Sequence, residues 1–199
     1  MQTRERDRAT NLAKTNPDAA LKAARLISDP FMRCQALAWA ARYAGTDADA
    51  VKLAREAERE LKTASDAFDA VAGAAWPVRA LIERDHPAEA DPLMQRAIDA
   101  AQHIVNPVRR VDALFLLVQA GWPAARPGWT AAVTGLVGSA RSASSSKLES
   151  VLRDLVLMLA GAGRDFAAAL AALPDGKIRR QAERRVQSRE FMFPRPFFW

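Results

Sequence analysis

The sequence contains one cysteine, Cys34, among 199 residues, and this scarcity limits the chemistry open to the protein. A single cysteine cannot form a disulfide within the chain and cannot build a zinc site from cysteine ligands. Its neighbours are apolar and rich in alanine, so we expect Cys34 to be a small buried hydrophobic residue. The first residues, "MQTRERDRATNLAK", lack the apolar segment of a secretory leader, which favours a reducing, cytoplasmic location.

The sequence also lacks the motifs that carry most catalytic and cofactor chemistry. It has no GxxxxGK[ST], GxGxxG, HExxH or GxSxG pattern, and neither His86 nor His103 stands at a metal-ligand spacing. We therefore expect no enzyme activity, no cofactor and no metal ion. The longest apolar run, "ALFLLVQAGW", is too short to cross a bilayer, so no membrane partner is expected either.

Alanine, leucine, arginine and glutamate dominate the composition, whereas glycine and β-branched residues are sparse. These residues favour helices, and no alternating strand pattern with hairpin turns is visible. The sequence therefore predicts an all-α protein. Eleven helices are expected, near residues 2–13, 16–27, 30–44, 47–63, 65–76, 87–105, 107–120, 127–141, 146–161, 164–172 and 176–190.

One short peptide recurs along the chain. "ISDPFMRCQAL" at 27–37 returns as "IVNPVRRVDAL" at 104–114 and, more weakly, as "LPDGKIRRQAE" at 173–183. Asp29 and Asn106 are suited to accept hydrogen bonds from the first amides of a helix, and a proline follows each at the position that needs no amide hydrogen. The recurrence predicts two-helix units that stack on one another.

An arginine stands four residues after each of these caps, at Arg33 and Arg110. We expect each arginine to reach its own cap or the acidic cap of a neighbouring unit. In the third copy Asp175 and Arg179 take the corresponding positions. The apolar residue before the cap, Ile27 or Val105, is expected to close the previous helix against the next one.

Taken together, Asp29-Pro30, Arg33, Ala36-Leu37 and the closing Ala44-Gly45 resemble a degenerate HEAT-type helical repeat. The resemblance implies a right-handed α-solenoid of about five to six antiparallel helix hairpins over residues 1–190. It also implies a protein that holds other macromolecules and has no catalytic residues of its own.

The charge of +6 is concentrated near the C-terminus. The segment "DADAVKLAREAERE" at 47–60 mixes both signs, and we interpret it as a solvent-facing helix side with i,i+4 ion pairs. The predicted last helix is basic. Its arginines could meet phosphates or an acidic protein, although a solvated face is the commoner arrangement. These arginines are Arg180, Arg184, Arg185 and Arg189.

Aromatic residues raise two further questions. Trp76-Pro77 and Trp122-Pro123 are expected to follow helix ends, where a tryptophan could seal the turn of a hairpin. The alternative is an aromatic row in a groove, as in HEAT-like DNA glycosylases, with Asp66, Asp69 and Asp112 nearby.

The tail, residues 191–199, crowds aromatic residues around two prolines that prevent a helix. It either folds back to cap the array or docks into a partner. Its candidate binding residues are Phe191, Phe193, Phe197, Phe198 and Trp199. The sequence thus favours a non-catalytic adaptor that binds a protein, and the alternative is a nucleic-acid-binding protein that uses its basic C-terminal third.

Overall fold

The structure, a computed structural model, describes residues 2–64, 66–122, 126–142 and 145–194. These residues form eleven α-helices and no β-strand, so the all-α prediction is confirmed. None of the helices in this part of the chain is long and apolar enough to cross a bilayer. The helices are α1 (Gln2–Ala13), α2 (Pro17–Arg25), α3 (Pro30–Arg42), α4 (Asp47–Leu61), α5 (Ala67–Glu83), α6 (Pro87–Ala101), α7 (Pro107–Ala120), α8 (Pro127–Arg141), α9 (Ser146–Gly161), α10 (Ala167–Ala171) and α11 (Lys177–Gln187).

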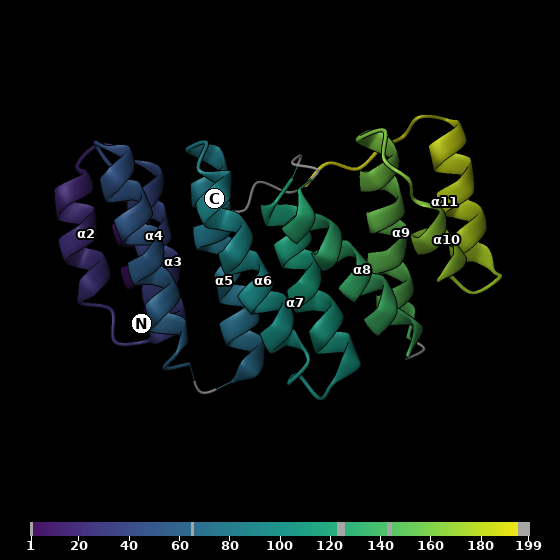
Figure 1. Ribbon diagram of the computed structural model, residues 1–199, viewed down its shortest axis with the longest axis horizontal. Coiled ribbons are helices and arrows are strands. Elements are labelled where there is room, and N and C mark those ends of the chain that lie inside the picture. The colour runs from purple at the N-terminus through teal and green to yellow at the C-terminus, as the bar shows by residue number, and fades with distance from the viewer. Residues whose placement is uncertain (1, 65, 123–125, 143–144, 195–199) are drawn as a thin grey trace.

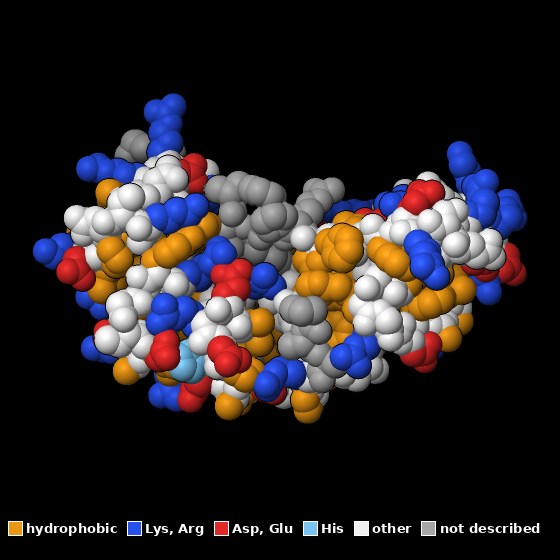
Figure 2. Space-filling model, turned by 90° about the horizontal axis from the view of Figure 1, so that it is seen from above, with side chains coloured by type: hydrophobic (Ala, Val, Ile, Leu, Met, Phe, Trp, Pro, Cys, Tyr) orange, Lys and Arg blue, Asp and Glu red, His pale blue; other side chains and the backbone are white. Residues whose placement is uncertain are grey.

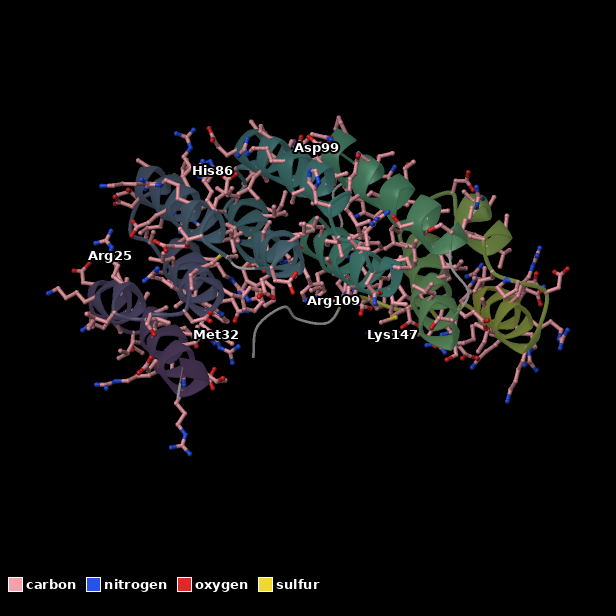
Figure 3. The ribbon with its side chains drawn as sticks, turned by 90° about the horizontal axis from the view of Figure 1, so that it is seen from below. Arg25, Met32, His86, Asp99, Arg109 and Lys147 are labelled. Atoms are coloured by element: carbon pink, nitrogen blue, oxygen red, sulfur yellow. The ribbon has the colours of Figure 1, made fainter. Side chains whose placement is uncertain are left out.

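The helices pack in two rows along the long axis of the molecule (Figure 1). The odd-numbered helices form the inner row, in which each helix packs directly on the next odd-numbered one. The even-numbered helices form the outer row, in which each helix packs on an inner helix that adjoins it in the chain. The array is curved, and the inner row lies on its concave side (Figure 3).

Small side chains let the inner helices approach closely. Helix α3 is buried continuously from Cys34 to Ala41, because it is packed against α1, α2, α4 and α5. Cys34 is fully buried, as predicted, and burial raises the pKa of its thiol. Farther along the row, leucines such as Leu117 and Leu155 fill the wider spaces, and both are completely buried.

Helix α5 departs from its predicted range. It does not end at Trp76 but continues through Pro77 to Glu83. Because Pro77 has no amide hydrogen, the carbonyl of Gly73, one turn earlier, loses its helical donor. The thiol of Cys34 approaches this carbonyl from α3, with 3.6 Å between Sγ and the oxygen. A weak sulfur donor therefore meets a carbonyl that would otherwise be unpaired inside the core.

Gly73 also fixes how closely α5 approaches its neighbours. A Cβ atom at Gly73 would overlap Leu61 Cδ2 and would lie 3.2 Å from Phe31 Cδ2. A larger side chain at this position would therefore require the side chains of Leu61 and Phe31 to shift. The single glycine inside α5 is explained by this contact rather than by a turn.

The first two copies of the recurring peptide have the predicted caps. The side-chain oxygen of Asp29 accepts a hydrogen bond from Met32 N at 2.8 Å. The side-chain oxygen of Asn106 accepts one from Val108 N at 2.9 Å. A proline opens the helix after each cap. The two sequence matches therefore correspond to the same local structure.

The arginines of these copies have a different role from the predicted one. Arg33 donates to the carbonyl of Ile27 at 2.7 Å, and Arg110 donates to the carbonyl of Ile104 at 2.7 Å. Each arginine thus ties its helix to the chain before its own cap and reaches no cap at all. Ile27 and Ile104 are equivalent buried residues, whereas Val105 is 91% exposed, so the prediction for Val105 is wrong.

The third copy is not equivalent to the first two. Helix α11 is capped at Gly176 instead of Asp175, and no side chain bonds to its first amides. Arg179 donates to the carboxylates of Asp175 and Glu183, each four residues away. The weaker sequence match at 173–183 therefore marks the end of the array rather than another repeat of the same kind.

Candidate partner-binding surfaces

The described part of the tail is anchored to α9 but leaves one aromatic ring in water. Phe191 is half-buried, and a Cβ atom at Gly161 would lie 2.9 Å from its Cβ. Met192 packs against the main core. Phe193, the next residue, is 65% exposed. Of the predicted binding residues, Phe197, Phe198 and Trp199 lie outside the described residues.

The end of α11 sets the direction in which the tail leaves. Arg189 adopts φ of +58°, and Glu190 N donates to the carbonyl of Arg185 at 2.8 Å. A left-handed residue followed by such a long backward bond is a common helix stop. The carboxylate of Glu190 also lies 3.5 Å from Arg185, so the chain turns back towards α9 at a defined point.

The four candidate arginines in α11 and just after it divide into two groups. Arg185 is half-buried and faces Glu190. Arg180, Arg184 and Arg189 are exposed and make no ion pair within the described residues. Lysine and arginine side chains gather at this end of the molecule in the space-filling view (Figure 2). This end is therefore a candidate surface for an anion.

The aspartates near the tryptophans are mostly neutralised by cations. Asp66 Oδ2 lies 2.5 Å from Arg109 Nη2, and Asp112 pairs with Lys147. The amide of Phe68 and the guanidinium of Arg109 hold the pKa of Asp66 below its usual range. Arg109, and not Arg110, is thus the residue that reaches the acidic cap of a neighbouring unit. Arg109 and Lys147 both lie towards the concave side (Figure 3).

Asp69 is the exception among these aspartates. Its pKa is raised, first by burial and then by the nearby charge of Asp66, with a smaller opposing effect from Arg109. The carboxylate therefore sits in the inner row without a full counter-charge.

The tryptophans pack into the fold at different kinds of position. Trp76 lies in the middle of α5 and meets the ring of Phe31 edge-on, with centroids 5.8 Å apart. Trp122 follows α7 and meets Trp129 edge-on at 6.2 Å. Trp129 is buried, and its indole N–H donates to the carbonyl of Val118 at 2.8 Å. The prediction that Trp76 and Trp122 occupy equivalent places is therefore wrong.

A series of grooves runs along the outer row, each between two neighbouring outer helices. Their volumes are about 190 Å³ between α2 and α4, 640 Å³ between α4 and α6, and 330 Å³ between α6 and α8. An inner helix forms the floor of each groove, with Ala40, Leu81 and Leu114 at the three floors. Of these pairs of outer helices, α6 and α8 also pack directly on each other.

The groove between α4 and α6 is the most voluminous of these three. Its apolar lining includes Val51, Leu81 and Leu93 from α4, α5 and α6. Four cations and two carboxylates stand along its rim. The charged residues are Lys52, Arg55, Glu58 and Arg59 of α4 and Glu89 and Arg96 of α6.

Two ion pairs cross this groove. Arg96 Nε lies 2.6 Å from one oxygen of Glu58, and Arg96 Nη2 lies 3.0 Å from the other. Arg55 Nη2 lies 2.7 Å from Glu89. The charges of 47–60 therefore pair between helices, and the prediction of i,i+4 pairs within this segment is wrong. The alternation of signs was visible in the sequence, but the partner helix was not.

Arg25 of α2 and Glu56 of α4 form a further pair of this kind. Two hydrogen bonds of 2.8 Å join their side chains. The outer helices α2, α4 and α6 are thus linked in succession by arginine and glutamate side chains.

Within the described residues, no group of three or more histidine, cysteine, aspartate or glutamate side chains could hold a metal ion. No family model, no curated protein and no solved structure matches this chain. The candidate surfaces therefore rest on the geometry of the chain itself.

Proposed function

We propose that this chain is a non-catalytic helical-repeat adaptor that binds a protein partner through its concave face, its aromatic C-terminal tail, or both. In this proposal the two rows of helices form a right-handed, HEAT-like α-solenoid that works in the cytoplasm. The observation that carries the proposal is the position of Phe193, a ring that is 65% exposed on a segment anchored by Phe191 and Met192.

An exposed aromatic side chain on an anchored backbone is well suited to bind a partner. Exposed large apolar side chains that serve no contact are a liability, and buried aromatics dominate the binding energy of many interfaces. Since the packing of Phe191 on α9 already restricts the backbone, little conformational entropy would be lost when a partner covers Phe193.

The test is affinity capture from nuclease-treated source lysate with four forms of the protein. They are the full chain, a chain that ends at Glu190, Phe193→Ser and the matched control Val105→Ser, which changes another exposed apolar residue. We expect the full chain and Val105→Ser to retain the same protein, and the other two forms to lose it. If all four forms retain that protein, a surface of the helical array binds it and the tail is not the binding segment. If no form retains any protein, the adaptor proposal is wrong.

A second candidate function, nucleic-acid binding, is favoured by Arg180, Arg184 and Arg189, which are exposed and make no ion pair within the described residues. Duplex DNA binding should then weaken steeply with salt, and the variant Arg180→Glu/Arg184→Glu should weaken it at low salt. If the affinity for duplex DNA does not change with salt concentration, nucleic-acid binding is excluded as the function. A glycosylase-like activity is supported less, because Asp66 and Asp112 are already paired with cations.

A further inference from the structure

The groove between α4 and α6 has features that the ion pairs across it do not explain. Lys52 and Arg59 are exposed on its rim and make no ion pair within the described residues. Glu56, an acidic side chain on which the charges of both cations act, is already bonded twice by Arg25. The rim therefore has more positive charge than its own carboxylates neutralise.

The spacing of these cations matches a helical ligand. Lys52, Arg55 and Arg59 stand at i, i+3 and i+7 on α4, and so form one stripe about 10 Å long. Carboxylates at the same spacing on a second helix would face this stripe if that helix lay along α4. The ligand that complements the rim is therefore an acidic helix rather than a single anion.

The lining below the rim suits the apolar face of such a helix. Leu81 and Leu93 form a floor that is almost completely buried. The apolar surface that a ligand can reach belongs to Ala48, Val51 and Pro92. An amphipathic helix that places apolar side chains in a groove between two helices is a common mode of peptide recognition.

The ion pair between Arg55 and Glu89 would not prevent binding. Their side chains are 64% and 38% exposed, and exposed pairs of this kind contribute only about 0–1 kcal/mol to stability. Arg55 can therefore exchange Glu89 for a carboxylate of the ligand at small cost. The bidentate pair of Glu58 and Arg96 can meanwhile keep α4 and α6 at their present separation.

We propose that the groove between α4 and α6 binds an acidic amphipathic helix of a partner protein, with carboxylates on Lys52, Arg55 and Arg59 and apolar side chains against Ala48, Val51 and Pro92. This inference rests on the proposed adaptor function and goes beyond it, because the groove lies in the outer row and is a surface distinct from the concave face and the tail.

The test uses the full-length protein and a labelled synthetic helical peptide, with binding measured by fluorescence anisotropy. The peptide has glutamates at i, i+3 and i+7 next to a stripe of leucines, and a matched peptide has glutamines instead. We expect the glutamate peptide to bind at low salt. The glutamine peptide should bind at least about tenfold more weakly. No binding of the glutamate peptide, or equal binding of both, would overturn the proposal.

Three variants locate the site. Lys52→Glu/Arg59→Glu reverses two exposed charges of the rim, and Ala48→Trp fills the groove from an exposed position on its lining. Each should weaken binding by about tenfold. The matched control Arg180→Glu/Arg184→Glu should bind within about twofold of the unmodified chain.

Two outcomes would show that the peptide does not occupy the groove. If the control variant on α11 loses as much affinity as Lys52→Glu/Arg59→Glu, the peptide binds through general electrostatic attraction and the groove proposal fails. If Ala48→Trp binds as tightly as the unmodified chain, the groove is empty in the complex and the proposal fails as well. Neither result changes the capture experiment with Phe193→Ser, which tests the adaptor function through a different surface.

Discussion

The inner and outer rows of this molecule are made from the same kinds of residue but are held together in different ways. Inner helices pack on one another through alanine and leucine, whereas α2, α4 and α6 are linked by arginine–glutamate pairs across grooves. Burial of a leucine contributes about 1.5–3 kcal/mol, and an exposed ion pair contributes about 0–1 kcal/mol. Buried packing on the inner row, to which the outer helices also contribute, therefore supplies most of the stability, and the ion pairs between outer helices supply little.

The largest effect is expected from a cavity in the inner row. Leu117 on α7 is completely buried, and Leu117→Ala should lower the free energy of unfolding by about 3 kcal/mol. The control Leu26→Ala changes a leucine that is 84% exposed and should cost less than about 0.5 kcal/mol. Urea unfolding measures both values. Equal decreases in the free energy of unfolding of the two variants would contradict the assignment of stability to buried packing.

The next effect distinguishes the copies of the recurring peptide. Asp29→Ala and Asn106→Ala each remove a side chain that caps a helix, and each should cost about 1 kcal/mol. Because the two caps belong to different helices, the losses in the double variant should add. Asp175→Ala should cost much less, since Gly176 occupies the cap position of α11. A loss at Asp175 as large as at Asp29 would show that the third copy is equivalent after all.

Much of the helical layout could be predicted from the sequence, because its signals are local. Caps such as Asp29 and Asn106, and the proline after each, mark where helices begin, and the composition excludes strands. The end of α5 could not be predicted in this way. Pro77 lies inside the helix, and the carbonyl that loses its helical donor is met by Cys34, which stands 43 residues earlier in the sequence.

The candidate surfaces were harder to predict than the helices. Phe193 was identified as a binding residue from composition alone, and the structure adds only that its ring is exposed on an anchored segment. The groove between α4 and α6 was missed, because the residues paired across it are 34 and 38 positions apart and sequence periodicity describes one helix at a time. The sequence signal that could have pointed to it is the stripe of Lys52, Arg55 and Arg59 at i, i+3 and i+7.

A smaller effect is expected from the ion pairs of the outer row. Glu58→Gln leaves Arg96 without its bidentate partner and should cost no more than about 0.5–1 kcal/mol at low salt, because Arg96 is 58% exposed. Urea unfolding in low and in about 1 M salt should show this loss shrinking, since screening weakens exposed charge pairs. If Glu58→Gln lowered the free energy of unfolding as much as Leu117→Ala, the ion pairs between outer helices would contribute as much stability as buried packing.

The smallest effects concern pH, and here the two rows should respond in opposite directions. On the outer row, hydrogen bonds from Arg25 hold the pKa of Glu56 below its usual value. Its contribution to stability is therefore fully present above the unfolded pKa of about 4.3 and is lost as the pH falls through the lower folded pKa. Glu56→Gln should be less stable than the unmodified chain at neutral pH, and the difference should disappear in acid.

On the inner row, burial and the charge of Asp66 raise the pKa of Asp69, so the sign is reversed. The folded state binds the proton of Asp69 more tightly than the unfolded state, whose pKa is about 3.9. Ionised Asp69 therefore lowers stability above its folded pKa, and this loss disappears as the pH falls below the unfolded value. Asp69→Asn should accordingly be more stable than the unmodified chain at neutral pH and should approach it in acid. If urea unfolding instead shows Asp69→Asn to be the less stable protein at neutral pH, the attraction of Arg109 outweighs burial, and acid weakens both rows alike.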